Sequence, residues 1–134
     1  MTAVHQLTGL PGGAEEHVAI LEGVLNKSSN LYFDLAWSVL WDDHFSNETQ
    51  RGVYVQFINK WSHRMIPGTD QVLSRNTTGD NRHVRTLGDY QADLNTTSLI
   101  YQYVDDRAFR NIALGQTYLD LLGSNYTAPE ICDQ

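Results

Sequence analysis

Residues 109–122, FRNIALGQTYLDLL, fit two secondary structures, and the two lead to different folds. One is a long strand over 109–120 with Gly115 at a bulge or bend. The other is a helix over 106–122, because apolar side chains also recur there at helical spacing. The preceding run SLIYQYV, residues 98–104, is rich in β-forming residues and favours the strand. We therefore expect the second half of the chain to form an antiparallel sheet, with the helix as the alternative.

More strands are expected between the middle of the chain and the two runs 98–104 and 109–120. Pro67-Gly68 marks a break. After it, two short runs at 71–75 and 83–87 flank the turn-forming segment 76–81, which is typical of a β-hairpin. Residues 90–94 are a candidate for one further strand.

The first half of the chain has the apolar spacing of helices. Residues 15–25 and 31–41 each present an apolar face at this spacing. Residues 53–61 fit either a helix or a strand, and we favour the helix because Trp61 and Met65 continue the helical spacing. Just before this stretch, Asn47-Glu48-Thr49 has the composition of a helix cap.

Size and composition indicate one domain with a true core. The chain has 134 residues, of which 41% are hydrophobic, so it has enough apolar surface for one core but not for two ordinary domains. We expect a single domain over 1–134, with a flexible lead at 1–13 and a polar tail at 124–134.

Charge and hydropathy exclude two classes of partner. The net charge is −7, and nucleic-acid binding relies on an excess of lysine and arginine, so we expect no nucleic-acid partner. No apolar run approaches the length of a membrane span, so we expect no membrane association. The first residues have no basic segment followed by an apolar one, and we therefore expect a cytoplasmic protein.

Three local patterns follow one another along the chain: Leu40-Trp41-Asp42-Asp43, then Arg51-Gly52 before an amphipathic stretch, then Ile112 with Tyr118-Leu119-Asp120. Their order resembles the nuclear-transport-factor-2-like superfamily, which includes SnoaL-like polyketide cyclases and ketosteroid isomerases. The resemblance implies an α+β fold in which three N-terminal helices pack in a curved antiparallel sheet, a cone-shaped barrel. Residues 62–97 match this pattern poorly.

A cone of this kind encloses an apolar pocket, where burial raises the pKa of a carboxylate so that it can move protons. The resemblance implies that Asp120 is a general acid or base and that Glu48 stands where isomerases carry their proton-shuttling carboxylate. Histidine is the residue type best suited to proton transfer near neutral pH, which makes His63 a candidate, and Tyr101 is a candidate donor to a substrate carbonyl. Helix capping, core packing and a surface position are the structural alternatives for these residues.

The leading hypothesis is a cyclase or isomerase that acts on a hydrophobic small molecule by proton transfer and needs no cofactor. The five histidines lack the spacing of a zinc site, so we expect no metal. By resemblance, the chain is expected to form a homodimer.

The alternative is a non-catalytic structural or interaction subunit of a larger assembly, such as a virion component, or an acidic inhibitor that docks on a basic partner. An enzyme would have a closed pocket that contains Asp120 or Glu48. A structural subunit would have a filled core and an exposed apolar patch.

Overall fold

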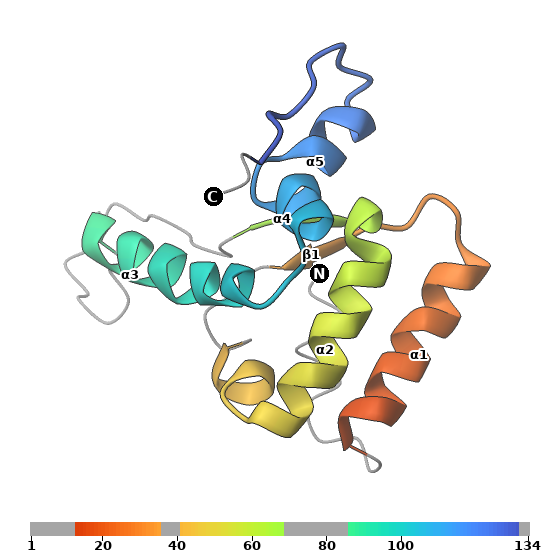
Figure 1. Ribbon diagram of the computed structural model, residues 1–134, viewed down its shortest axis with the longest axis vertical. Coiled ribbons are helices and arrows are strands. Elements are labelled where there is room, and N and C mark those ends of the chain that lie inside the picture. The colour runs from red at the N-terminus through yellow and green to blue at the C-terminus, as the bar shows by residue number, and fades with distance from the viewer. Residues whose placement is uncertain (1–12, 36–40, 69–85, 132–134) are drawn as a thin grey trace, which may run out of the picture.

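The computed structural model describes residues 13–35, 41–68 and 86–131 of the chain. Within this part most residues are helical, and two very short strands pair with each other (Figure 1). The elements in chain order are α1 (Gly13–Lys27), β1 (Phe33–Leu35), the one-turn π-helix η2 (Trp41–Phe45), α2 (Glu48–Trp61), the 3₁₀ turn η3 (Ser62–Arg64), β2 (Met65–Pro67), α3 (Leu87–Ser98), the 3₁₀ turn η5 (Leu99–Gln102), α4 (Asp106–Ile112) and α5 (Gln116–Leu121).

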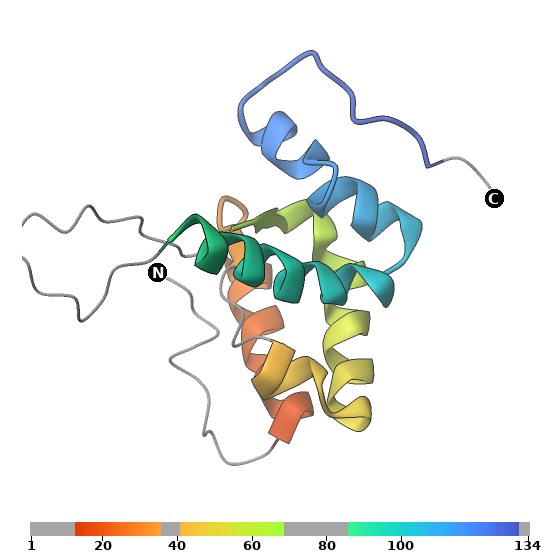
Figure 2. The ribbon, with the colours of Figure 1, turned by 90° about the vertical axis from the view of Figure 1, so that its left-hand side faces the viewer.

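The helices form two groups around the strand pair. α1 and α2 lie side by side, and α4 and α5 stand over the end of α2, where they contact η3 (Figure 1). α3 runs crosswise along one side of the α1–α2 pair (Figure 2). The strands therefore lie at the junction between the groups.

The expected curved antiparallel sheet, with its cone-shaped barrel, is wrong. The sheet among the described residues has two strands, and these run parallel with Phe33 opposite Met65 and Leu35 opposite Pro67. Parallel strands need a crossover between them, and here η2 and α2 lie in that connection. Two strands of three residues enclose no hollow.

The strand expected over 98–104 is a helix end, and the strand expected over 109–120 is two short helices. α3 and η5 cover the first region, and α4 and α5 cover the second. Two local signals explain the outcome. The carboxylate of Asp105 accepts the backbone N–H of Ala108 at 2.7 Å and starts α4. Gly115 has a φ of +79°, in the left-handed region, and separates α4 from α5.

Two further expectations from the sequence are corrected. The helix expected over 31–41 is wrong, because β1 occupies Phe33–Leu35 and η2 begins only at Trp41; residues 36–40 lie outside the described part. The strand expected over 90–94 is part of α3, whose start is set by a capping box between Thr86 and Asp89. The expected hairpin over 71–87 lies almost wholly outside the described residues.

Two helices are confirmed. The stretch 15–25 lies within α1, and 53–61 lies within α2. The cap before α2 is confirmed as well, because the side chain of Asn47 accepts the backbone N–H groups of Thr49 and Gln50 at 3.0 and 3.2 Å. The core draws on all of these elements and includes Leu21, Leu25, Phe33, Leu35, Phe57, Ile58, Met65, Ile100 and Ile112.

Arg64 connects the end of α1 to the strand pair from inside the protein. Its residue surface is only 9% exposed. The guanidinium donates from Nε to the carbonyl of Leu31 at 2.6 Å and from Nη2 to the carbonyl of Ser28, both in the segment between α1 and β1. It also lies over the ring of Tyr32, 5.3 Å from the centroid. One side chain therefore binds the carbonyl just after α1 and a second carbonyl shortly before β1, and so holds β1 beside β2.

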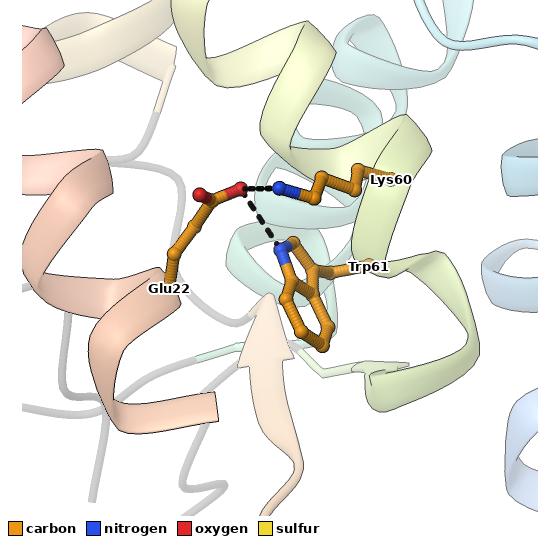
Figure 3. A network of polar contacts seen from close by, with 3 residues as sticks. All are labelled: Glu22, Lys60 and Trp61. Carbon is orange, nitrogen blue, oxygen red and sulfur yellow. Dashed lines mark hydrogen bonds and ion pairs between the residues drawn. The ribbon is translucent and has the colours of Figure 1, made fainter. Parts of the chain in front are cut away.

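At the surface, α1 and α2 are connected by a small polar network (Figure 3). The carboxylate of Glu22 on α1 accepts Nζ of Lys60 at 2.7 Å and Nε1 of Trp61 at 3.0 Å, both at the end of α2. These two donors lower the pKa of Glu22, Lys60 being the larger cause. The ion pair is largely exposed, so we expect it to contribute only about 0.2–1 kcal/mol.

We expect replacement of Arg64 by methionine to destabilise the fold by about 2–4 kcal/mol, because two backbone carbonyls lose charged donors. Urea unfolding followed by circular dichroism measures this change. Arg107→Met is the matched control: its guanidinium also donates to a carbonyl, that of Asn59 at 3.1 Å, but the residue is exposed. The control should lose less than about 1 kcal/mol. Equal losses in the two variants would contradict the role given to Arg64.

Candidate functional site

The four residues singled out from the sequence lie on different elements. Asp120 is exposed on α5 and accepts the side-chain amide of Gln116 at 2.6 Å. Glu48 is exposed in the first turn of α2, beside the Asn47 cap. His63 is exposed in η3, where its ring stacks on Trp61 with centroids 5.9 Å apart. None of the four bonds to another within the described structure, so they do not form a shared catalytic group.

Tyr101 lines a pocket among the described residues. Its ring meets Phe109 edge-on, with centroids 6.0 Å apart. Burial, and to a lesser extent the charge of Asp34, raise the pKa of the Tyr101 hydroxyl to about 12. The hydroxyl therefore keeps its proton at neutral pH and is available as a hydrogen-bond donor.

The pocket beside Tyr101 lies between the end of β2 and the second half of α3. It has a volume of about 540 Å³ and is open to solvent. The described residues that line it are Pro67, Gly68, Tyr90, Leu94, Asn95, Thr97, Ser98 and Tyr101.

At one edge of this pocket the backbone of Gly68 lies directly against Asp34 of β1. A Cβ atom at Gly68 would stand 2.2 Å from Oδ1 of Asp34. Only glycine fits this approach without a shift of the Asp34 carboxylate.

A second group of functional side chains is buried between α1, η2 and α2. Nδ1 of His17 lies 2.7 Å from the Tyr54 hydroxyl. The ring of His44 lies 4.6 Å from the ring of Tyr54 and 5.6 Å from that of His17. All three residues are at most 7% exposed. We call this group the histidine–tyrosine cluster.

The environment of the cluster favours uncharged forms. Burial lowers the pKa of His17, and the neighbouring His44 lowers it further. Burial also raises the pKa of Tyr54 to about 12, with a contribution from the negative charge of Glu15. Among the described residues the buried Nε2 of His17 has no hydrogen-bond partner, which makes a charge on this ring still more costly.

The histidine–tyrosine cluster has no room for a substrate. The void beside His44 and Tyr54 measures about 30 Å³, which is little more than the volume of one water molecule. The cluster is therefore part of the core. Sequence reasoning missed it, although a signal was present: His17 is four and eight residues from Leu21 and Leu25, on the buried face of α1.

The C-terminal region presents apolar side chains to solvent. Tyr118, Leu121 and Leu122 are 49%, 47% and 62% exposed, and their spacing of three and four residues places them on one face of α5. We call these three residues the C-terminal apolar face. The tail that follows also exposes Tyr126 and Ile131.

Ala128 attaches the described part of the tail to the helices. The backbone carbonyl of Ala128 accepts the Arg110 guanidinium at 3.0 Å, and its N–H donates to the side-chain oxygen of Gln116 at 2.8 Å. Figure 1 shows the tail rising from α5 and returning beside it. Ala128 itself is 2% exposed, so the tail is packed on α4 and α5 at this residue.

The described residues contain neither a metal-binding cluster nor a membrane-spanning helix. No group of three or more histidine, cysteine, aspartate or glutamate side chains is placed to hold a metal ion within 13–35, 41–68 and 86–131. In the same ranges no helix has both the length and the apolarity that a membrane span requires.

Comparisons with protein-family models, with curated proteins and with solved structures find no match to this chain. They therefore neither support nor contradict the resemblance to the nuclear-transport-factor-2-like superfamily, although the fold that it implied is not the one observed.

We expect the stability of the protein to fall as the pH drops below about 6.5. The pKa of His17 in the folded state is below its ordinary value of 6.5, so the unfolded chain binds the proton first. The contribution of uncharged His17 to the free energy of unfolding is complete above pH 6.5 and is lost progressively at lower pH. Melting temperatures measured between pH 8 and pH 5 test this.

Two variants identify the source of the pH effect. His17→Gln should reduce the loss of melting temperature between pH 8 and pH 5, because glutamine does not titrate. His63→Gln removes an exposed histidine and should leave that loss unchanged. A loss in His17→Gln as large as in the unmodified protein would show that His17 is not responsible.

Proposed function

We propose that this chain is a non-catalytic interaction subunit that docks onto a partner protein through its C-terminal apolar face. The observation that carries the proposal is the exposure of three large apolar side chains on one side of α5, two of them within this six-residue helix and the third, Leu122, at its C-cap. Covering each of them would stabilise a complex by about 1 kcal/mol, from the usual value of apolar burial.

The way in which α5 is attached supports this proposal. A helix of this length is not stable alone. The buried Thr117 anchors it, because its hydroxyl donates to the carbonyl of Ser62 at 2.9 Å. The inward side of α5 is therefore fixed by a polar contact, while its large apolar residues point away from the core, where a partner can reach them.

Charge indicates what kind of partner suits this face. The exposed carboxylate of Asp120 lies on the same helix, Glu130 is exposed on the tail, and the whole chain carries a net charge of −7. Two copies would repel each other, whereas a partner with an apolar hollow and a basic rim would be attracted. This fits an assembly subunit or an acidic inhibitor better than a homodimer.

Cyclase or isomerase chemistry stays an untested prediction, as does the cytoplasmic location. The prediction of cyclase or isomerase chemistry depended on a closed apolar pocket around a buried carboxylate. Asp120 and Glu48 are both exposed, and neither lines either of the two pockets described above. For this reason we prefer the interaction subunit.

Site-specific photo-cross-linking in the native host tests the proposal. A benzophenone amino acid at position 121 should capture one defined protein with a basic surface. The same group at position 20 is the control, because Ile20 on α1 is exposed to a similar degree, 39% against 47%. Equal capture from both positions would count against the C-terminal apolar face.

Binding between the purified proteins then measures the contribution of the face. Leu121→Asp with Leu122→Asp should weaken the complex at least about tenfold, since two apolar contacts are lost and acidic charge is added. Val24→Asp, at a residue 42% exposed on α1, should leave affinity unchanged. Unchanged affinity in the double variant would refute the proposal. A homodimer, seen as a mass in solution of twice 15.2 kDa that the double variant reduces to one chain, would refute it as well.

A further inference from the structure

Both backbone groups of the tail residue Ala128 are bound by side chains of the helices. Its N–H donates to Oε1 of Gln116 at 2.8 Å. Its carbonyl accepts Nη2 of Arg110 at 3.0 Å and Nε of the same guanidinium at 3.3 Å. Hydrogen bonds to the main chain are the means by which proteins hold extended peptides. We call Arg110 and Gln116 the backbone clip.

The backbone clip is held in its binding geometry by α4 and α5. Gln116 begins α5, and the nitrogen of its side-chain amide donates to the carboxylate of Asp120 at 2.6 Å. This bond uses the amide nitrogen and leaves the amide oxygen for the N–H of Ala128. The same oxygen lies 3.4 Å from Nη2 of Arg110 on α4. Asp120 is therefore a positioning residue, and a clip fixed in this way loses little freedom when a peptide binds.

The residue held by the clip is small and extended. Ala128 is 2% exposed, so its methyl group is enclosed, and a larger side chain would have to push its surroundings apart. Pro129 follows it in the sequence. A residue before proline favours an extended backbone, and proline itself has no N–H that needs a partner. The clip therefore suits an extended segment with an alanine-sized side chain.

The grip on the tail is narrow. Among the described tail residues, 124–127 and 129–131 are exposed and Ala128 is buried. The net contribution of each hydrogen bond is small, because water takes the place of the partner when the bond opens. A segment with so little buried surface opens locally while the helices stay folded. The tail therefore behaves as a ligand on a tether.

We propose that the backbone clip is a binding site for an extended peptide segment with an alanine-sized side chain, and that the chain's own tail occupies it as an exchangeable ligand. When the tail leaves, a segment of the same chemistry from another protein can take its place. The site consists of Arg110 and Gln116, so it does not depend on the C-terminal apolar face, and either proposal can fail without the other.

Hydrogen exchange of the unmodified full chain tests whether the tail opens by itself. The amide of Ala128 should exchange more slowly than that of Glu130, but at least about tenfold faster than that of Phe57 in α2. Urea well below the unfolding midpoint should leave its rate unchanged, because local opening exposes little surface. Exchange of Ala128 as fast as Glu130, or as slow as Phe57, would overturn the proposal.

A variant of the clip tests whether Gln116 holds the tail. Gln116→Met keeps the length of the side chain and removes both polar atoms, so it should speed exchange at Ala128 about fivefold while α2 stays protected. Gln91→Met, at an exposed position on α3, is the matched control and should leave exchange unchanged. Equal rates at Ala128 in the two variants would show that Gln116 is not part of such a site.

Peptide binding to the full chain tests the site directly. In Ala128→Asp the larger, charged side chain no longer fits the enclosed position, so the tail leaves the clip. A capped peptide of residues 124–131, SNYTAPEI, should then shift the side-chain amide resonances of Gln116 in a saturable way at millimolar concentration. The same peptide with aspartate in place of alanine should bind at least about tenfold more weakly.

Thr127→Asp is the matched control for this measurement. It adds the same charge at the exposed neighbouring position and keeps the tail in the clip. Several-fold more peptide should be needed with Thr127→Asp, because the tethered tail competes for the site. The proposal fails if SNYTAPEI gives no saturable shift in Ala128→Asp, if both peptides bind equally, or if the two protein variants have the same affinity for SNYTAPEI.

Discussion

The buried guanidinium of Arg64 is the contact on which the arrangement of the other elements depends. It lies where α2 turns through η3 into β2, and it binds two carbonyls of the segment between α1 and β1. At the same turn, the backbone carbonyl of Ser62 accepts a hydrogen bond from the Thr117 hydroxyl. The Ser62 hydroxyl accepts one from the side-chain amide of Asn111 at 2.9 Å. The N-terminal helices, the strand pair and the C-terminal helices are therefore all attached to the three residues Ser62–Arg64.

Sequence patterns predicted the helices whose signals are local. α1 and α2 have regular apolar spacing, and Asn47 is a recognisable cap. The run 98–104 is rich in β-forming residues but is helical, because intrinsic preference for strand is weak and depends on strand partners, and the two described strands pair with each other. The capping signals at Thr86 with Asp89 and at Asp105 were readable and were given too little weight.

The candidate sites were less predictable, because they depend on which distant segments come together. Tyr101 was singled out as a candidate donor in an enclosed cone, whereas the structure places it beside an open pocket of a different fold, and its role as a donor stays a prediction. The histidine–tyrosine cluster needs α1, η2 and α2 in place before His17, His44 and Tyr54 meet.

The parallel pairing of β1 with β2 has a consequence for the order of folding. Phe33 and Met65 meet only after the whole segment between them has been brought back on itself, and that closure costs chain entropy before any strand contact can repay it. We therefore expect the α1–α2 contacts to form before the strands pair, because they offset this cost.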